Sequence, residues 1–243
     1  MINPLIFRAY DIRGVVGQDL TAEGMYDIGR AFGTFVQEKF GGNKIVVGRD
    51  NRKHSEELQQ AYISGLLATV CHVTNVGLAS SPMLYYASCK YDFDAGSNIT
   101  ASHNPKEYNG VKMVAKNAHS ICGEDLQEML RMIDEERFAK GKGEFAEKQI
   151  FEDYLADIKE RVKLSKKYKV VLDAGNGITG MFVPRIFREL GCEVIELHCT
   201  LDGTFPNHEA NPESEKNMED VKQEVLRSGA DLGLAFDGDG DRV

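Results

Sequence analysis

The sequence lacks any stretch that is long and apolar enough to predict a membrane-spanning helix. Its longest uncharged apolar segment runs from Ile63 to Cys71, far short of the ~20 residues that a span needs. The N-terminal residues also lack a basic segment followed by a sustained apolar core, which a signal peptide would have. We therefore expect no membrane partner and no secretory signal.

The cysteines lack the pattern of a disulfide framework. Their number, five, is odd, and no two of them form a CxxC pair. They are Cys71, Cys89, Cys122, Cys192 and Cys199. Because disulfides persist mainly in oxidising compartments, we expect reduced, structural thiols in a cytoplasmic protein.

Positive charge is scarce as well. The chain has 29 Lys and Arg residues against 38 Asp and Glu residues, which gives a formal net charge of -9. An acidic surface disfavours nucleic acid as a partner, although a locally basic cleft could still bind an anionic substrate. With 42% hydrophobic and 28% charged residues and no low-complexity tract, the composition is that of a globular protein.

Strands and helices are expected to alternate along the chain. Apolar runs predict strands at residues 44–48, 72–76, 95–100, 111–115, 169–173, 193–197 and 231–236. Helical spacing predicts helices that begin after Thr21, at Ser55 and at Ser81, and others over 125–138, 152–163, 181–190 and 218–227. A turn is expected at Asn109-Gly110. This alternation predicts an α/β fold, as two tandem three-layer α/β domains with mixed, mostly parallel sheets.

A Lys-Gly-Lys-Gly sequence interrupts this pattern within residues 139–150. We place the domain boundary there and expect domains at 1–148 and 149–243, since one domain usually takes ~100–200 residues. The last expected strand is followed at once by an acidic loop, and the sequence stops at Val243. Because ligand sites gather at that edge of a parallel sheet, we expect the chain to be a fragment whose second domain is truncated.

The acidic loop is the first candidate site. Asp237, Asp239 and Asp241 alternate with two glycines directly after an apolar strand. Three carboxylates this close repel one another unless a cation neutralises them, and oxygen ligands suit Mg²⁺, Ca²⁺ or Mn²⁺. A solvated acidic turn is the alternative. An EF-hand is excluded, because Arg242 stands where that loop needs glycine.

The second candidate site is the segment Thr100-Ala-Ser-His-Asn-Pro105, with Lys112 shortly after it. A serine on a small polar loop after a strand is suited to exposing its hydroxyl, and His103, Asn104 and Lys112 place donors and proton carriers nearby. A neighbouring Ser-His pair is more often part of an ordinary loop, so spacing alone does not indicate an activated nucleophile.

Two further motifs are weaker. Gly175-Asn-Gly-Ile-Thr-Gly180 matches the dinucleotide-binding GxGxxG pattern. However, Asp173 precedes it and would repel a pyrophosphate, so a tight turn is the better interpretation. Asp202-Gly-Thr204 is similar to the DGT of aspartate-nucleophile phosphatases, but Thr200 stands where their nucleophile would be.

Four segments in sequence order resemble the phosphoglucomutase/phosphomannomutase family of α-D-phosphohexomutases. They are Phe7-Arg-Ala-Tyr-Asp-Ile-Arg-Gly14, the loop from Thr100 to Lys112, Asp202-Gly-Thr-Phe-Pro-Asn207, and Asp237 to Arg242. The similarity covers the whole chain, and the serine and aspartate loops together are highly specific. The first segment is more similar to bacterial phosphomannomutase/phosphoglucomutases than to phosphoglucosamine mutases, which stay an alternative.

The resemblance implies a role for each matching residue. Ser102 is expected to be phosphorylated in the resting enzyme. Asp237, Asp239 and Asp241 are expected to hold one Mg²⁺, with a phosphoserine oxygen from Ser102 completing the protein ligands. Arg242 is expected to lie beside the phosphoserine.

Other matching residues are expected to surround the phosphoserine. Lys112 and Arg13 are the candidates for proton transfer and for stabilising charge, while His103 and Asn104 would support the loop. Tyr10 and Arg49 are weaker candidates for binding phosphate or substrate. Arg49 could equally be a salt-bridged residue at a strand end.

The implied activity interconverts hexose 6-phosphate and hexose 1-phosphate, of mannose and/or glucose, with hexose 1,6-bisphosphate as intermediate. The chemistry mainly requires positioning and charge stabilisation. Family members have four domains, of which the third supplies sugar contacts and the fourth a phosphate-binding loop. Both are absent from this sequence, so the isolated chain could be inactive, and a non-catalytic metal- and phosphate-binding fragment is the alternative.

Overall fold

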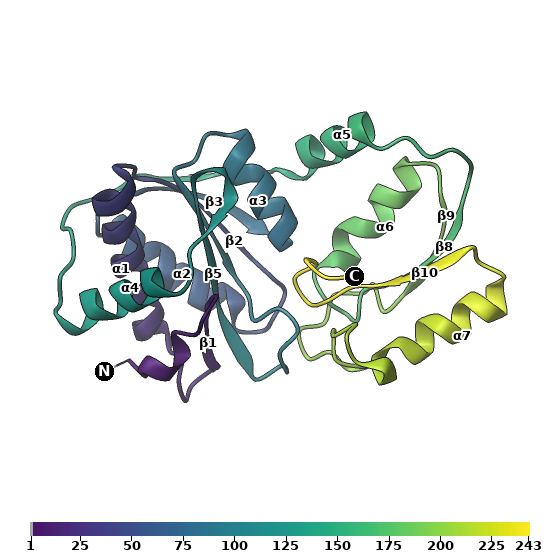
Figure 1. Ribbon diagram of the computed structural model, residues 1–243, viewed down its shortest axis with the longest axis horizontal. Helices are drawn as coiled ribbons and strands as arrows, with labels where there is room; N and C mark the ends of the chain where they lie inside the picture. Colours follow the sequence, from purple (N-terminus) through teal and green to yellow (C-terminus); the bar gives the residue numbers. More distant parts are fainter. Residues whose placement is uncertain (1) are drawn as a thin grey trace.

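The computed structural model describes residues 2–243, which form two β-sheets lying side by side with helices packed against them (Figure 1). The first sheet has seven strands in the order β1-β5-β4-β2-β3-β7, with β6 paired to β5. β2, β3, β4 and β7 are parallel, whereas β5 is antiparallel to its neighbours β1, β4 and β6. The strands are β1 (Ile12–Val15), β2 (Lys44–Arg49), β3 (His72–Leu78), β4 (Ala95–Ile99), β5 (Tyr108–Ala115), β6 (His119–Ser120) and β7 (Phe145–Glu147).

The alternation of side chains along β2 explains why both faces of the first sheet are buried. Ile45 and Val47 pack on one face against α1 (Ala22–Phe40), α2 (Ser55–Leu67) and α4 (Glu124–Asp134). Val46 packs on the other face against α3 (Ser81–Lys90). Because successive strand residues point to opposite faces, a continuous apolar run suits a strand between two helical layers. The first sheet is therefore the middle of three layers.

The second sheet has three parallel strands in the order β10-β8-β9. The strands are β8 (Lys169–Asp173), β9 (Glu193–Leu197) and β10 (Leu232–Ala235). Val170 and Leu172 pack on the side of α6 (Thr179–Glu189), and Val171 packs against α7 (Glu219–Ser228) on the other face. The expectation of two three-layer α/β units with mixed, mostly parallel sheets is confirmed.

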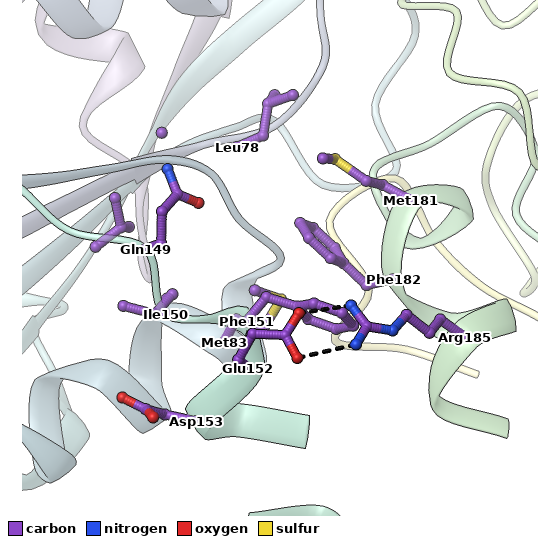
Figure 2. Close-up of a pocket in the computed structure, with 12 residues that line it drawn as sticks. Leu78, Met83, Gln149, Ile150, Phe151, Glu152, Asp153, Met181, Phe182 and Arg185 are labelled. Atoms are coloured by element: carbon purple, nitrogen blue, oxygen red, sulfur yellow. Dashed lines mark hydrogen bonds and ion pairs between the residues drawn. The ribbon is translucent and has the colours of Figure 1, made fainter. Parts of the chain in front are cut away.

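Apolar side chains join the two units. The cluster that contains α3 of the first unit also contains Phe182 and Ile186 of α6. Helix α5 (Phe151–Arg161) follows the first sheet and lies at this junction, where the Phe151 and Phe182 rings are 5.0 Å apart. Figure 2 shows Arg185 of α6 reaching Glu152 through two hydrogen bonds, of 2.5 and 2.9 Å. These contacts hold the two sheets against each other beside a cleft of about 590 Å³.

Two sequence expectations need correction. Asn109-Gly110 is not a turn but part of β5, where Gly110 lies opposite Arg13 of β1. A Cβ atom on Gly110 would collide with the Ile12 carbonyl oxygen, so the glycine serves a close strand contact. The last long helix of the first unit ends at Asp134, four residues earlier than expected, and Glu136 then adopts a left-handed backbone with φ of 51°.

The sequence also did not reveal the short strands β1, β6 and β7, or the 3₁₀ helices η1 (Pro4–Ile6), η2 (Lys116–Ala118) and η3 (Glu215–Met218). β1 and β7 lie at the two edges of the first sheet, and β6 pairs only with β5. Short edge strands carry too few residues for a clear alternation. Within residues 2–243, no helix has the length and apolar character that crossing a membrane requires.

Candidate active site

The loop after β4 presents Ser102 toward the second unit. Ser102 is fully buried and has a left-handed backbone with φ of 54°, a conformation that costs energy in a residue with a side chain. Its backbone N–H donates to Thr100 Oγ1 at 2.9 Å. Its hydroxyl donates to Asp237 Oδ2 at 2.6 Å, and His103 Nδ1 lies 3.3 Å from Ser102 Oγ. The two motifs that the sequence singled out therefore meet at this hydroxyl.

The aspartate loop after β10 depends on its two glycines. A Cβ atom on Gly238 would collide with the carbonyl oxygen of Ser102, so only glycine permits this approach of the two loops. Gly240 has φ of 78°, which turns the chain so that its N–H and that of Arg242 donate to Asp237 Oδ1 at 2.9 and 3.1 Å. This backbone places one oxygen each of Asp237, Asp239 and Asp241 within 4.8 Å of one another.

Lys112 of β5 supplies positive charge to this acidic cluster, which we define as Asp237, Asp239 and Asp241. Its Nζ lies 2.7 Å from Asp239 Oδ2 and 2.5 Å from Asp241 Oδ2. Burial alone would lower the pKa of Lys112, but the two carboxylates outweigh burial and raise the pKa above its ordinary value. Lys112 is therefore a firmly held cation in this arrangement, which favours charge stabilisation over proton acceptance.

The buried carboxylates differ in their protonation. Burial, followed by repulsion from Asp239, raises the pKa of Asp237 to about 7. Burial also acts to raise the pKa of Asp239, but the adjacent Lys112 outweighs it and holds the pKa below its ordinary value. Ser81, the first residue of α3, donates its hydroxyl to Asp239 Oδ2 at 2.5 Å.

The acidic cluster fits a divalent cation. Asp239 Oδ1 is buried and has no hydrogen-bond partner among residues 2–243, which is costly for a carboxylate oxygen unless something else neutralises it. Burial, and after it repulsion from Asp239, raises the pKa of Asp237, and a bound cation would offset both. All the donors are oxygen atoms, the set that hard cations such as Mg²⁺ prefer.

Arg52 holds the serine loop in place. Its guanidinium donates to the carbonyl oxygens of Ser102 and Asn104 at 2.9 and 2.6 Å, and to those of Pro105 and Tyr108 at 2.8 and 3.1 Å. Asp50 balances its charge at 3.2 Å, and both side chains are 1% exposed.

No sequence pattern indicated Arg52 or Ser81 as a site residue. The sequence offered only one indirect signal for Arg52, which is the polar run immediately after the buried strand β2. Ligand sites gather at that edge of a parallel sheet. Ser81 was expected only as the start of a helix. Its contact with Asp239 joins residues 158 positions apart, which no local pattern reveals.

Arg13 supports the same loop from β1. Its Nη1 donates to the Ala101 carbonyl oxygen at 3.2 Å and to Asn104 Oδ1 at 2.9 Å, while Asp11 pairs with its guanidinium at 2.5 Å. Burial, followed by Arg242 and Arg13, lowers the pKa of His103. His103 is therefore mainly neutral at pH 7.

A cleft of about 430 Å³ opens beside the acidic cluster. Its lining brings together residues from both units, including Tyr10, Arg13, Lys112, Asp241 and Arg242. The Tyr10 side chain is 80% exposed and therefore available to a ligand. Arg242 forms an ion pair with Glu213 at 2.6 Å, so its guanidinium is held at one side of the cleft.

Arg49, by contrast, lies apart from this cleft and from the acidic cluster. Its guanidinium lies 3.2 Å from Glu56 and lines a separate hollow with Gln59 and Asn75. The alternative interpretation, a salt-bridged residue at a strand end, describes this position.

Comparisons with known proteins agree with this geometry. Residues 4–140 match the family profile of phosphoglucomutase/phosphomannomutase, alpha/beta/alpha domain I, and residues 152–243 match domain II. A phosphomannomutase/phosphoglucomutase of Pseudomonas aeruginosa is 43% identical over 238 residues, which are 98% of this chain and 51% of that protein. A phosphoglucomutase of Neisseria meningitidis is 41% identical, over 98% of this chain and 52% of its own length.

A solved structure has the same fold. A phosphoglucomutase/phosphomannomutase family protein from Burkholderia thailandensis superposes with a TM-score of 0.95 at 40% identity, covering 100% of this chain and 54% of that one. The chain therefore spans about half the length of the relatives that it matches. Since the two family profiles together match most of its residues, the chain belongs to the phosphoglucomutase/phosphomannomutase family.

Proposed function

We propose that this chain is the phosphoserine- and metal-bearing half of a phosphohexomutase that interconverts hexose 6-phosphate and hexose 1-phosphate, of mannose and/or glucose. The observation that carries the proposal is the 2.6 Å hydrogen bond from the Ser102 hydroxyl to Asp237. It joins the expected phosphoryl carrier in one unit to the expected metal cluster in the other. The names of the relatives, phosphomannomutase/phosphoglucomutase and phosphoglucomutase, support the same activity.

In the proposed reaction, Ser102 begins as a phosphoserine. A hydroxyl oxygen of the bound hexose monophosphate attacks the phosphorus, a new O–P bond forms, and the bond to Ser102 Oγ breaks. The sugar hydroxyl loses its proton and Oγ gains one, which leaves free serine and hexose 1,6-bisphosphate. The reverse step, using the other phosphate of the bisphosphate, restores the phosphoserine and releases the isomeric monophosphate.

The residues of the candidate site would have different roles in this reaction. Asp237, Asp239 and Asp241, with a phosphoserine oxygen of Ser102, would hold one Mg²⁺, which would neutralise charge on the transferring group. Asp237 already accepts a hydrogen bond from the Ser102 hydroxyl, so it is placed to orient that oxygen.

The cations and His103 would serve the phosphoryl group itself. Lys112 and Arg242 would stabilise its negative charge, and Arg13 with Asn104 would keep the loop in register. His103, 3.3 Å from Ser102 Oγ and mainly neutral, would carry a proton to or from that oxygen. Tyr10, exposed at the cleft, would contact the substrate.

The remaining parts of the proposal concern the whole protein. We propose a division at residues 148 and 149, because β7 ends the first sheet at Glu147 and α5 of the junction begins at Phe151. The relatives are about twice as long, and the part that this chain lacks would supply further sugar and phosphate contacts. A cytoplasmic location, expected from the cysteine pattern, completes the proposal.

The decisive experiment uses the longer parent protein and replaces Ser102 by alanine. We expect Ser102→Ala to remove phosphorylation, read by intact mass, and to abolish turnover of glucose, mannose and glucosamine 6-phosphates in coupled assays. Ser165→Ala, which changes an exposed loop serine, is the matched control and should keep both. Near-normal turnover in Ser102→Ala would refute the phosphoserine role. Phosphorylated, magnesium-binding protein without turnover of any sugar would favour the non-catalytic alternative.

A further inference from the structure

A second group of ligand-bearing side chains lies in the second unit, outside the cleft. Asp173, His198 and His208 each offer one ligand atom, and these atoms lie within 4.8 Å of one another. We call this group the histidine cluster. The cluster is largely enclosed, since the side chains of Asp173 and His208 are 0% and 13% exposed and that of His198 is 20% exposed.

The sheet explains why these residues meet. Asp173 ends β8 and pairs in register with Leu197, which ends the neighbouring strand β9. His198 follows immediately, and its left-handed backbone, with φ of 48°, turns the chain at this point. His208 returns from the long loop that follows, so all three side chains gather at the carboxyl ends of parallel strands, where ligand sites form in such sheets.

Hydrogen bonds of His208 leave a ring nitrogen facing a carboxylate. Its Nδ1 lies 2.8 Å from the Glu209 carbonyl oxygen, which can only accept, so Nδ1 carries the proton. In the neutral ring, Nε2 then has a lone pair, yet it lies 3.0 Å from Asp173 Oδ2. Two acceptors at this distance require a proton or a metal ion between them.

His198 has a comparable arrangement. Its Nε2 lies 2.9 Å from Asp220 Oδ2, on α7. Metal-binding histidines usually donate one ring N–H to a carboxylate or a backbone carbonyl, which orients the ring and leaves the other nitrogen for the metal. His208 with Glu209 and His198 with Asp220 both match this pattern. His198 and Asp220 also line a hollow at the surface.

We propose that Asp173, His198 and His208 bind a divalent transition-metal ion such as Zn²⁺, at a site separate from the acidic cluster. Two imidazole nitrogens and one carboxylate oxygen form a donor set that suits Zn²⁺ and its first-row neighbours, whereas Mg²⁺ prefers oxygen ligands alone. Three protein ligands leave further coordination positions to water.

The bound ion would anchor a loop that reaches the candidate active site. The segment between His198 and His208 carries Gly203, which packs against the backbone of Asn51 and Arg52, and Phe205, whose ring lies 5.0 Å from the Arg52 guanidinium. Arg52 in turn holds the Ser102 loop. An ion bound at the histidine cluster would therefore hold both ends of the segment 198–208, which contacts Arg52 and through it supports the Ser102 loop.

The test titrates the untagged 243-residue chain with Co²⁺ in excess Mg²⁺, which occupies the acidic cluster. We expect one Co²⁺ per chain, with visible absorption bands that Zn²⁺ displaces. His198→Gln should weaken Co²⁺ binding at least about tenfold, since one ligand is lost. His119→Gln, at an exposed histidine of β6, is the matched control and should bind as the unchanged chain does.

Folding of the variants is followed independently. Mg²⁺ binding at the acidic cluster should survive in His198→Gln, and Zn²⁺ should raise the thermal midpoint of the unchanged chain but not that of the variant. His208→Gln, measured in the same way, should repeat the result. Co²⁺ affinity that stays the same in both variants would overturn the proposal. So would Co²⁺ binding that is lost in Asp239→Asn and kept in His198→Gln.

Discussion

The acidic cluster and the histidine cluster lie along the same edge of the same three-stranded sheet, yet they are built differently. Asp237, Asp239 and Asp241 face the first unit and receive Ser102 and Lys112 from it. The histidine cluster takes every ligand from the second unit. The carboxyl end of one sheet therefore carries both an all-oxygen donor set and a mixed nitrogen and oxygen donor set. The acidic cluster depends on how the two units pack, whereas the histidine cluster joins the ends of β8 and β9 to the long loop that follows β9.

The loops explain the difference. In the aspartate loop, Gly238 packs directly on the Ser102 backbone, so the carboxylates lie at the boundary between the units. The loop after β9 is long and folds back over the end of β8, which returns His208 to Asp173. A substitution that disturbs the apolar contacts between the units should therefore weaken ion binding at the acidic cluster more than at the histidine cluster.

The largest effect is expected from Arg52→Met. It removes the donor to four loop carbonyls and leaves the Asp50 carboxylate buried without its partner. Removing one member of a buried ion pair typically costs about 3–5 kcal/mol. We expect a loss of that size in the free energy of unfolding, measured by urea denaturation. Arg161→Met, at an exposed ion pair, should cost about 0–1 kcal/mol, and equal losses in the two variants would contradict the role given to Arg52.

Phe182→Ala should follow, because it opens a cavity in the cluster that joins the units. Phe182 is 5% exposed and its ring centre lies 5.0 Å from that of Phe151, and such truncations typically cost about 3 kcal/mol or more. Mg²⁺ binding, measured by calorimetry, should weaken, whereas Co²⁺ binding at the histidine cluster should persist. Phe40→Ala, at a 42% exposed side chain, serves as control. Parallel loss of both ions would show that the clusters are not independent.

Asp239→Asn should act on the acidic cluster alone. It removes one anionic ligand and the carboxylate that pairs with Lys112, so we expect Mg²⁺ affinity to fall about tenfold or more. Asp220→Asn, a matched change beside the histidine cluster, should leave Mg²⁺ affinity unchanged and weaken Co²⁺ binding. An unchanged magnesium titration for Asp239→Asn would count against the metal site.

Arg49→Ala should have the smallest effect. The side chain pairs with an exposed Glu56 in a separate hollow, and pairs of this kind contribute about 0–1 kcal/mol. We expect both clusters to bind their ions as before and the free energy of unfolding to change within that range. A marked loss of Mg²⁺ affinity would instead support the predicted role of Arg49 in the site.

Local sequence patterns predicted much of this molecule. The apolar run of β2 and the cap at Thr21, whose oxygen accepts from the Gly24 N–H at 3.1 Å, are decided by neighbouring residues. The meeting of Ser102 with Asp237 followed only from the resemblance to the family. Its sequence separation of 135 positions lies beyond any periodicity.

Three features escaped prediction, each for a different physical reason. Strand β1 has four residues, including an arginine and a glycine, so it has no apolar alternation to recognise. Arg52 matters because it contacts backbone oxygens of a distant loop, and any residue type presents such oxygens. His198 and His208 became partners of Asp173 only once the register of β8 and β9 was known.

The contact between Gly238 and the Ser102 carbonyl makes the distance between the two loops a property of backbone atoms. A magnesium ion held by the three aspartates and by a phosphoserine oxygen of Ser102, as proposed, would bind more tightly when the two units are packed together, and it would stabilise that packing by the same free energy. Magnesium binding and the packing of the two units would then be coupled in one equilibrium. The distance between two spectroscopic labels, one on each unit, should therefore shorten as magnesium is added.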